Sequence, residues 1–204
     1  MKLENHVFAK QRACGSISTL MLQVLTGTQK GRKLKVPKGR TIRPTTSRVK
    51  KSIFDSLGDI SDLRVLDVFA GTGGLGIESL SRDAAHVTFI EKDTAVFKIL
   101  CQNLTTCGFL DKATAMCSDY AQALKALSAK GEIFDIIFID PPYPLYATHE
   151  VKDFILAAAP VLSESGIMII EHDHKIDDTP SGLDRTTKPF GGTHVSYFRR
   201  SGEE

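Results

Sequence analysis

A glycine-rich segment, Asp67–Gly76, follows an apolar run and combines one carboxylate with four glycines. Glycines let a backbone approach a ligand closely, and a helix that begins there favours negative charge at its N-terminus. The spacing Gly71-Thr-Gly73-Gly-Leu-Gly76 also satisfies the dinucleotide-binding pattern G-x-G-x-x-G. Asp67 separates the two interpretations, because a carboxylate repels a pyrophosphate but attracts the ammonium and sulfonium groups of S-adenosylmethionine. The segment therefore favours S-adenosylmethionine as the cofactor.

Two further carboxylates follow the next two apolar runs, in step with this segment. Glu91 ends the run Val87–Glu91 and is placed to accept hydrogen bonds from the two ribose hydroxyls of the cofactor. Asp119 follows the third run and can accept from the adenine amino group, with Tyr120 against the ring. Taken alone, each pattern also fits an ordinary exposed carboxylate after a strand. The predicted cofactor-binding residues are Asp67, Phe69, Ala70, Gly71, Gly73, Glu91, Lys92, Asp119, Tyr120 and Asp140.

A second segment, Asp140-Pro141-Pro142-Tyr143, follows the most apolar run of the chain, Phe134–Ile139. Two prolines fix the backbone and lack N–H groups, so their carbonyls are rigid acceptors. The exocyclic amine of a nucleic-acid base is a poor nucleophile, because its lone pair is delocalised into the ring. The Asp140 carboxylate and the Pro141 carbonyl can hold both amino hydrogens and turn the lone pair toward a methyl donor. Tyr143 offers a face on which the base can stack. The predicted catalytic residues are Asp140, Pro141, Pro142 and Tyr143.

Positive charge is concentrated near the N-terminus, although the net charge of the 204 residues is only +2. Residues 24–54 contain ten basic side chains and no Asp or Glu. A solvated charged face is one explanation. Charges of one sign repel each other, however, so a bound polyanion explains the segment better and favours nucleic acid as the partner. The ten are Lys30, Arg32, Lys33, Lys35, Lys38, Arg40, Arg43, Arg48, Lys50 and Lys51.

The strands and helices that would position these residues alternate along the chain from residue 64 onward, as in β/α units. Strands are predicted at Arg64–Phe69, Val87–Glu91, Ala113–Cys117, Phe134–Ile139 and Gly166–Glu171, with a closing pair at Thr186–Pro189 and His194–Arg199. Helices are predicted at Leu75–Ser81, Thr94–Cys107, Tyr120–Ala129 and His149–Ala159. This order predicts an α/β fold with a seven-stranded, Rossmann-like sheet of the class I methyltransferase type, in which the last strand inserts antiparallel.

A small N-terminal extension precedes the sheet. Met21–Val36 alternates around two glycines as a β-hairpin would, and Ser47–Leu57 has the apolar spacing of a helix. Residues 1–20 show no periodic pattern. We therefore predict a tail or disordered extension at 1–20, a basic hairpin and helix at 21–62, and a methyltransferase domain at 63–204.

Several classes of protein are disfavoured by what the sequence lacks. No run approaches the roughly 18–20 consecutive apolar residues that span a bilayer, and the N-terminus lacks the apolar core of a secretory signal. The four cysteines show no C-x-x-C spacing, so we read them as reduced thiols and expect no metal. We expect a cytoplasmic monomer without membrane contact.

Taken together, the segments resemble those of the bacterial 16S ribosomal RNA (guanine-N2) methyltransferases. The resemblance spans about Met21–Arg200. It rests on Gly27-Thr-Gln-Lys-Gly31-Arg-Lys-Leu34, Arg43-Pro44-Thr45-Thr46-Ser47-Arg48-Val49, the glycine loop, Asp140–Tyr143 and Phe190-Gly191-Gly192-Thr193. Two places differ from the family: Ser47 and Lys50-Lys51 stand where it usually has Asp and Glu, and Pro144-Leu-Tyr146-Ala replaces a basic, glycine-containing loop.

This likeness implies a guanine flipped out of the RNA and held by Asp140 and Tyr143. It implies ribosomal RNA as the partner, within the small ribosomal subunit or an assembly intermediate, and a bacterial cytoplasm. With the Arg-Pro-Thr-Thr segment included, the predicted RNA-binding residues are Lys30, Arg32, Lys33, Lys35, Arg40, Arg43, Thr45, Thr46 and Arg48.

Other functions remain open at this point. The same amine chemistry serves adenine N6 in DNA or RNA and the side chain of a protein glutamine; Asp rather than Asn before the two prolines leans only modestly toward guanine. An RNA-binding assembly factor without activity is a second class, which the intact Asp140 and Tyr143 disfavour. A nicotinamide-dependent oxidoreductase would leave Asp67 and the Pro-Pro turn unexplained.

Overall fold

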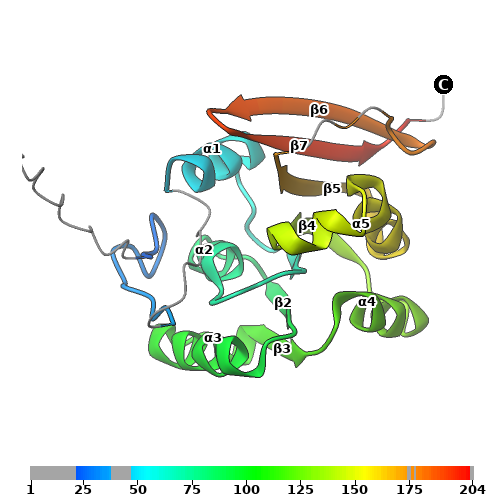
Figure 1. The fold of residues 1–204 in the computed structure, drawn as a ribbon. Coiled ribbons are helices and arrows are strands. Elements are labelled where there is room, and N and C mark those ends of the chain that lie inside the picture. The colour runs from blue at the N-terminus through cyan, green and yellow to red at the C-terminus, as the bar shows by residue number, and fades with distance from the viewer. Residues whose placement is uncertain (1–21, 38–46, 174–175, 177, 203–204) are drawn as a thin grey trace, which may run out of the picture.

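The computed structural model describes residues 22–37, 47–173, 176 and 178–202, and Figure 1 shows the arrangement of their elements. The helices are α1 (Ser47–Leu57), α2 (Gly74–Ser81), α3 (Thr94–Cys107), α4 (Tyr120–Ala129) and α5 (Val151–Ala158). The strands are β1 (Arg64–Asp67), β2 (His86–Glu91), β3 (Ala113–Cys117), β4 (Phe134–Ile139), β5 (Leu162–His172), β6 (Leu183–Phe190) and β7 (Thr193–Arg200). Short 3-10 helices lie at η1 (Leu110–Lys112), η2 (Tyr143–Ala147) and η3 (Ala159–Val161).

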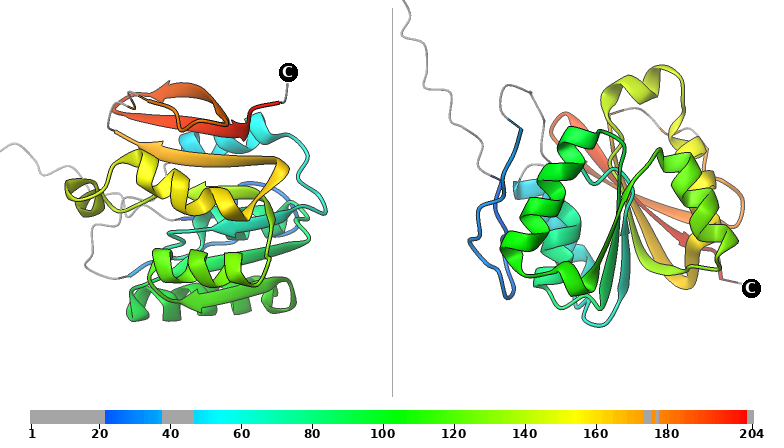
Figure 2. Two further views of the ribbon diagram at one scale, coloured as in Figure 1. Left: turned by 90° about the vertical axis from the view of Figure 1, so that its right-hand side faces the viewer. Right: turned by 90° about the horizontal axis from the view of Figure 1, so that it is seen from below.

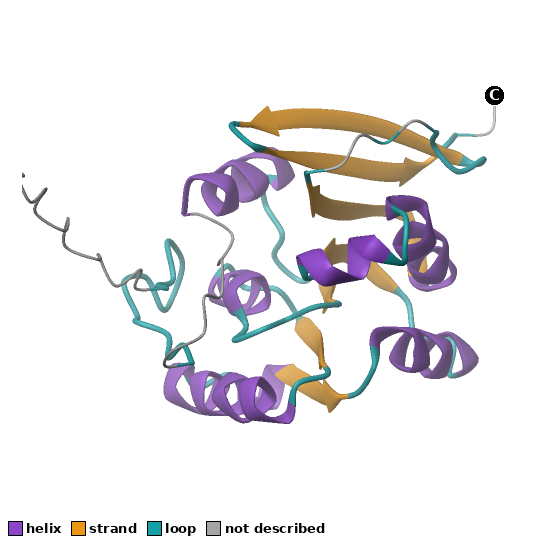
Figure 3. Ribbon diagram, viewed as in Figure 1, coloured by secondary structure: helices purple, strands orange, loops and turns teal. Residues whose placement is uncertain are grey.

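The strands form one seven-stranded sheet in the order β3-β2-β1-β4-β5-β7-β6. β1 to β5 pair in parallel, and β7 pairs antiparallel with both β5 and β6. The predicted sheet and its antiparallel last strand are thus confirmed, and the alternation of strands and helices is drawn in Figure 3. The strand order reverses between β1 and β4, which is where open α/β sheets bind their ligands.

Helices cover both faces of this sheet (Figure 2). α1, α2 and α3 belong to one hydrophobic cluster and α4 and α5 to the other. Successive side chains of β4 alternate between the clusters: Ile136 and Phe138 face the first, and Ile137 and Ile139 face the second. A strand covered on both faces is apolar along its whole length, which explains why Phe134–Ile139 is the most apolar run of the sequence.

Local sequence signals account for several element boundaries. The Asp93 side chain accepts hydrogen bonds from the backbone N–H groups of Ala95 and Val96 and so caps α3. Gly108 ends the same helix in the left-handed conformation, with φ 72°. α3 therefore has the bounds that the sequence predicts. β5 begins earlier than predicted, at Leu162 instead of Gly166.

The N-terminal segment 22–37 has the predicted hairpin form, although its strand pairing is short. Its two halves run antiparallel, with one bridge between Gln23 and Lys33, and three backbone hydrogen bonds join them: Leu34 N–H to the Leu22 carbonyl, Val24 N–H to that of Arg32 and Gly31 N–H to that of Val24. The backbone N–H groups of Leu25 and Thr26 also donate to the carboxylate of Glu78 in α2. Because a two-stranded hairpin alone is only marginally stable in water, these bonds to α2 help to hold it in place. In the described part of the chain, no helix is long and apolar enough to cross a membrane.

Candidate active site

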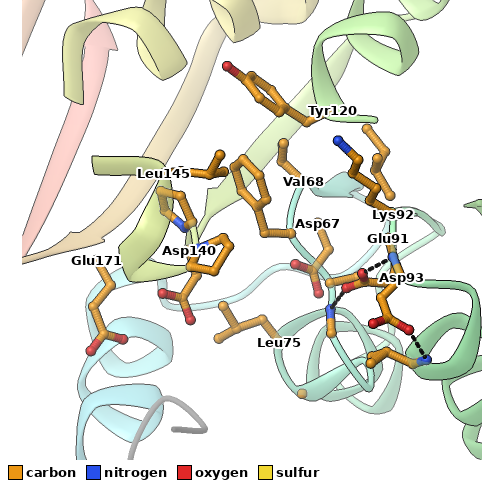
Figure 4. A pocket seen from close by; sticks show the side chains of 18 of the residues that line it. Asp67, Val68, Leu75, Glu91, Lys92, Asp93, Tyr120, Asp140, Leu145 and Glu171 are labelled. Carbon is orange, nitrogen blue, oxygen red and sulfur yellow. Dashed lines mark hydrogen bonds between the residues drawn. The ribbon is translucent and has the colours of Figure 1, made fainter. Parts of the chain in front are cut away.

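A cavity of about 560 Å³ lies at the carboxyl ends of β1, β2, β4 and β5 (Figure 4). Its volume falls within the range of roughly 300–1,000 Å³ that is typical of cofactor and small-molecule sites. The glycine loop Asp67–Leu75 forms one side, and residues that follow β4 and β5 form another. The two segments that sequence analysis singled out thus open onto the same space.

The glycine loop turns the chain from β1 into α2. Gly73 stands at the N-cap of α2 with φ 92°, and Gly71 has φ 56°. L-amino acids with a Cβ atom adopt such left-handed conformations only at a cost, so this turn favours glycine. The backbone N–H of Gly76 donates to Asp67 Oδ2 at 2.9 Å. Strand β1, the loop and the first turn of α2 are therefore tied together around one carboxylate.

Asp67 is a buried acid at the floor of the cavity, with 2% of its surface exposed. Burial, with a smaller contribution from the neighbouring charge of Glu91, raises the pKa of Asp67 to about 7, although the hydrogen bond from Gly76 acts to lower it. A buried carboxylate with a raised pKa binds a proton or another cation favourably. Asp67 can therefore hold the positively charged part of a ligand.

Glu91 closes the other side of the loop from the end of β2. Its Oε2 accepts from the backbone N–H of Gly71 at 2.9 Å, and its Oε1 accepts from that of Asp93 at 2.7 Å. Burial raises the pKa of Glu91. Each carboxylate oxygen has about two acceptor sites, so both oxygens keep capacity for hydroxyl donors of a ligand.

An ion pair and an aromatic cluster complete this half of the cavity. Lys92 Nζ lies 3.0 Å from Asp119 Oδ2, and this hydrogen bond is the main reason that the pKa of Asp119 is lowered. The ring of Tyr120 lies 5.0 Å from that of Phe69 and 5.5 Å from that of Phe154, measured between centroids. The cluster offers a flat ligand an apolar wall.

The Asp140-Pro-Pro-Tyr turn follows the central strand β4. Asp140 is half-buried, and Pro142 stands at the N-cap of η2 with φ −64°. Tyr143 is the first residue of η2, but its side chain lies outside what the structure describes, so the predicted stacking stays a prediction. Leu145 and Tyr146 of η2 also line the cavity. Asp140, Pro141 and Pro142 thus line the same cavity as the glycine loop.

Most of the predicted cofactor-binding and catalytic residues meet here. Those that line the cavity are Asp67, Phe69, Ala70, Gly71, Glu91, Lys92, Asp119, Tyr120, Asp140, Pro141 and Pro142. Gly73 does not line it; its part is the left-handed turn that starts α2. The roles of these residues stay predictions.

The predicted basic surface is smaller than the count of charges suggested. Lys30, Arg32 and Lys33 border a shallow surface depression together with Thr106 of α3, and Arg48 is exposed. Four of the predicted RNA-binding residues lie outside the described part of the chain: Arg40, Arg43, Thr45 and Thr46. That the exposed residues bind a polyanion stays a prediction.

Lys50 and Lys51 correct the prediction that the whole basic segment faces a polyanion. Lys50 is 1% exposed, and its Nζ lies 2.9 Å from Glu78 Oε2. Lys51 is exposed but pairs with Asp55, four residues further along α1. Counting charges along the chain missed these partners, because one lies in α2 and becomes a neighbour only in the folded protein.

Several residues outside the two motifs line the cavity and were not predicted from the sequence. Lys50, Glu171, His172 and Thr193 all line the cavity. For Glu171 a signal was available: it follows an apolar strand at the same edge of the sheet, as Asp140 does. No comparable signal marked Lys50.

Known proteins share both the sequence and the fold. A family model described as Conserved hypothetical protein 95 matches residues 22–199. "Putative rRNA methyltransferase YlbH" from Bacillus subtilis (strain 168) is 36% identical over 185 residues, covering 89% of this chain and 100% of that protein. "Ribosomal RNA small subunit methyltransferase D" from Escherichia coli (strain K12) is 42% identical over 123 residues, covering 60% of each chain.

Among solved structures, "Putative methyltransferase yhhF from Escherichia coli" superposes with a TM-score of 0.78 at 31% identity, covering 90% of this chain and 99% of that one. The predicted fold class and family are both confirmed by these matches. The chain belongs to the Conserved hypothetical protein 95 family, that of the ribosomal RNA small subunit methyltransferase D proteins.

Proposed function

We propose that this protein transfers a methyl group from S-adenosylmethionine to the exocyclic N2 amine of a guanine in small-subunit ribosomal RNA. The observation that carries the proposal is the shared cavity: the Asp140-Pro-Pro-Tyr turn after β4 and the glycine loop after β1 open onto one space. Relatives named as ribosomal RNA methyltransferases support ribosomal RNA as the substrate.

The donors and acceptors around the cavity fit S-adenosylmethionine. Asp67 is a buried carboxylate, suited to the cationic methionine part; Glu91 keeps acceptor capacity for ribose hydroxyls; and Phe69 and Tyr120 offer a wall to a flat ring. When bound, this cofactor supplies an electrophilic methyl group. The protein's own residues then have to bring a nucleophile to it in the right orientation.

In the proposed mechanism, Asp140 and Pro141 orient the nucleophile. The Asp140 carboxylate and the Pro141 carbonyl each accept one hydrogen of the amine, which draws its lone pair out of conjugation with the ring. Proline has no N–H to compete for these bonds and a fixed φ, so the acceptors are positioned in advance. Asp140 can also accept the proton that the amine loses. Holding reactants in a productive geometry is among the largest contributions an enzyme makes.

Basic residues of the N-terminal segment supply the binding of the polymer in this proposal. Lys30, Arg32 and Lys33 are exposed beside one another, and lysine and arginine contacts to phosphates provide most of the sequence-independent affinity for nucleic acid. Flipping a base out of its stack costs a few kcal/mol, which phosphate contacts help to offset.

Methyl transfer from labelled cofactor to small ribosomal subunits, isolated from an Escherichia coli strain without its own methyltransferase D, tests the proposal. Nucleosides released from the product are resolved by mass spectrometry, and N2-methylguanosine is expected. Asp140→Ala should abolish transfer but weaken cofactor binding far less, because Asp67 and Glu91 still hold the cofactor. The matched control is Asp111→Ala, which removes an exposed carboxylate of η1 away from the cavity and should leave transfer unchanged.

Other products would point to other functions. N6-methyladenosine would replace guanine by adenine as the target, and a labelled protein would indicate the glutamine reaction. Cofactor binding without transfer to RNA, DNA or protein would favour the assembly factor. Binding of a nicotinamide cofactor in place of S-adenosylmethionine would contradict the proposal altogether.

A further inference from the structure

Two carboxylates lie at adjacent positions where the neighbouring strands β4 and β5 reach the cavity. In the parallel pairing of β4 with β5, Ile139 lies opposite Ile170. The next residue of each strand is acidic: Asp140 after β4 and Glu171 near the end of β5. Both line the cavity, and Figure 4 shows both side chains directed to the same side of it. A base whose amine lies at Asp140 would therefore place its neighbouring atoms near Glu171.

The position of Glu171 is set by the sheet. Glu171 lies inside β5 and pairs with Val195 of β7, one residue beyond the last pair of β5 with β4. Its backbone carbonyl accepts a hydrogen bond from the Tyr146 hydroxyl at 3.0 Å, which ties β5 to η2 and hence to the Asp140 turn. Groups held on strands keep their geometry better than groups on loops. Glu171 therefore suits a role in recognition.

We propose that Glu171 selects guanine by accepting a hydrogen bond from its N1–H. This inference rests on the proposed function and deepens it. Guanine presents N1–H directly beside its N2 amine, so two adjacent carboxylates can take these neighbouring donors together. Adenine and 2-aminopurine carry a lone pair at N1 instead, and a carboxylate facing that lone pair repels it. Selectivity thus arises from one added attraction and one added repulsion.

The substitution Glu171→Gln distinguishes recognition of the base by Glu171 from a role of this side chain in packing. Glutamine has nearly the shape of glutamate, but its amide can either accept from guanine N1–H or donate to a bare N1. Glu171→Gln should therefore narrow the preference for guanine, while Glu171→Asp, which keeps the charge, should retain the preference even if transfer slows. Glu164→Gln is the matched control, since Glu164 lies on the same strand with a side chain that is 94% exposed.

The test uses reconstituted small ribosomal subunits whose RNA carries guanine or 2-aminopurine at the nucleotide that the wild type methylates, which is first located by mass spectrometry of RNA fragments. 2-Aminopurine keeps the N2 amine and replaces N1–H by a lone pair. The wild type and the Glu164→Gln variant should prefer guanine by about tenfold or more, and Glu171→Gln should lower this ratio about tenfold. Cofactor affinity and the thermal midpoint of Glu171→Gln, measured in parallel, should match those of the wild type.

An unchanged guanine to 2-aminopurine ratio in a folded, cofactor-binding Glu171→Gln protein would overturn the inference and leave the proposed function standing. A loss of the preference in Glu171→Asp equal to that in Glu171→Gln would also overturn it, because the carboxylate would then be irrelevant. Absence of wild-type transfer to guanine would overturn the proposed function and this inference together.

Discussion

Lys50 and Glu78 form an ion pair of 2.9 Å although their side chains are only 2% and 0% exposed. Glu78 also accepts hydrogen bonds from the backbone of Leu25 and Thr26, and Lys50 Nζ donates to the carbonyl of Gln23 at 2.8 Å. Burial opposes ionisation of Glu78, but the charge of Lys50 and these backbone bonds hold its pKa below the ordinary value. One buried carboxylate thus joins α1, α2 and the N-terminal segment.

Removing the positive partner should destabilise the protein strongly. Lys50→Met leaves the Glu78 carboxylate buried without its cation, and breaking a buried pair in this way costs about 3–5 kcal/mol. The free energy of unfolding from urea titration measures the loss. Lys51→Met is the control, because Lys51 pairs with Asp55 in an exposed position, with side chains 69% and 56% exposed, and such pairs contribute roughly 0–1 kcal/mol. If the two substitutions lower the free energy of unfolding equally, the buried pair of Lys50 with Glu78 does not contribute more stability than an exposed pair.

Two glycines of the N-terminal segment should respond very differently to alanine. Both are left-handed, Gly27 with φ 76° and Gly31 with φ 81°, so each substitution carries a similar backbone strain of about 1–2 kcal/mol. A Cβ on Gly27 would lie 1.6 Å from the Ser81 carbonyl oxygen, whereas one on Gly31 meets nothing within 4 Å. Gly27→Ala should therefore separate the segment from α2. Proteolysis before residue 37 should be faster in Gly27→Ala than in Gly31→Ala; similar rates would show that the close contact with Ser81 is unimportant.

The pH dependence of stability should change when Asp67 is neutralised. The folded pKa of Asp67 is about 7, against an ordinary value of 3.8, so the folded state binds this proton more tightly than the unfolded state. Its contribution to stability is fully present below pH 3.8 and is lost as pH rises to about 7. Asp67→Asn has no group that ionises at this position, so it does not lose stability in this way as pH rises. In the cofactor-free protein, the variant should gain in thermal midpoint over the wild type between pH 5 and pH 8, by about 2–4 °C for each kcal/mol.

The same substitution should weaken cofactor binding. An amide has no charge with which to hold a cation, so we expect the dissociation constant for S-adenosylmethionine to rise about tenfold or more in Asp67→Asn. In the wild type, affinity should increase from pH 6 to pH 8 as Asp67 ionises; in the variant this increase should be much smaller. Calorimetric titration at several pH values provides the measurement. If cofactor affinity depends on pH in the same way in both proteins, the ionisation responsible belongs to another group, of which Glu91 is the first candidate.

Charge reversal in the exposed basic segment should act on RNA binding alone. Replacing Lys30 and Lys33 by glutamate should lower the affinity for a small-subunit RNA fragment and reduce the slope of log affinity against log salt by about 0.7–0.9 per lost phosphate contact. Lys130→Glu is the control, an exposed lysine at the C-terminal end of α4 on the opposite face of the sheet. If the slope does not change, these lysines form a solvated surface instead of a binding site.

Much of this fold follows from local patterns in the chain. The bounds of α1, α3, α4, β3 and β4 agree with the sequence prediction, because apolar periodicity, caps such as Asp93 and stops such as Gly108 act between near neighbours. The two motif segments could also be placed at the same edge of the sheet, since the carboxyl ends of parallel strands share one edge.

The tertiary structure alone decided which residues become partners. Periodicity shows that a side chain is buried but not what it meets, so Lys50 counted as a surface charge until α2 placed Glu78 beside it. The hairpin at 22–37 could be predicted from its alternation, but not that Leu25 and Thr26 would donate to Glu78 of α2. Glu171 became a neighbour of Asp140 through the register of β4 with β5. Register and helix packing depend on the energy of the whole core, and for that reason residues distant in sequence meet only in the folded chain.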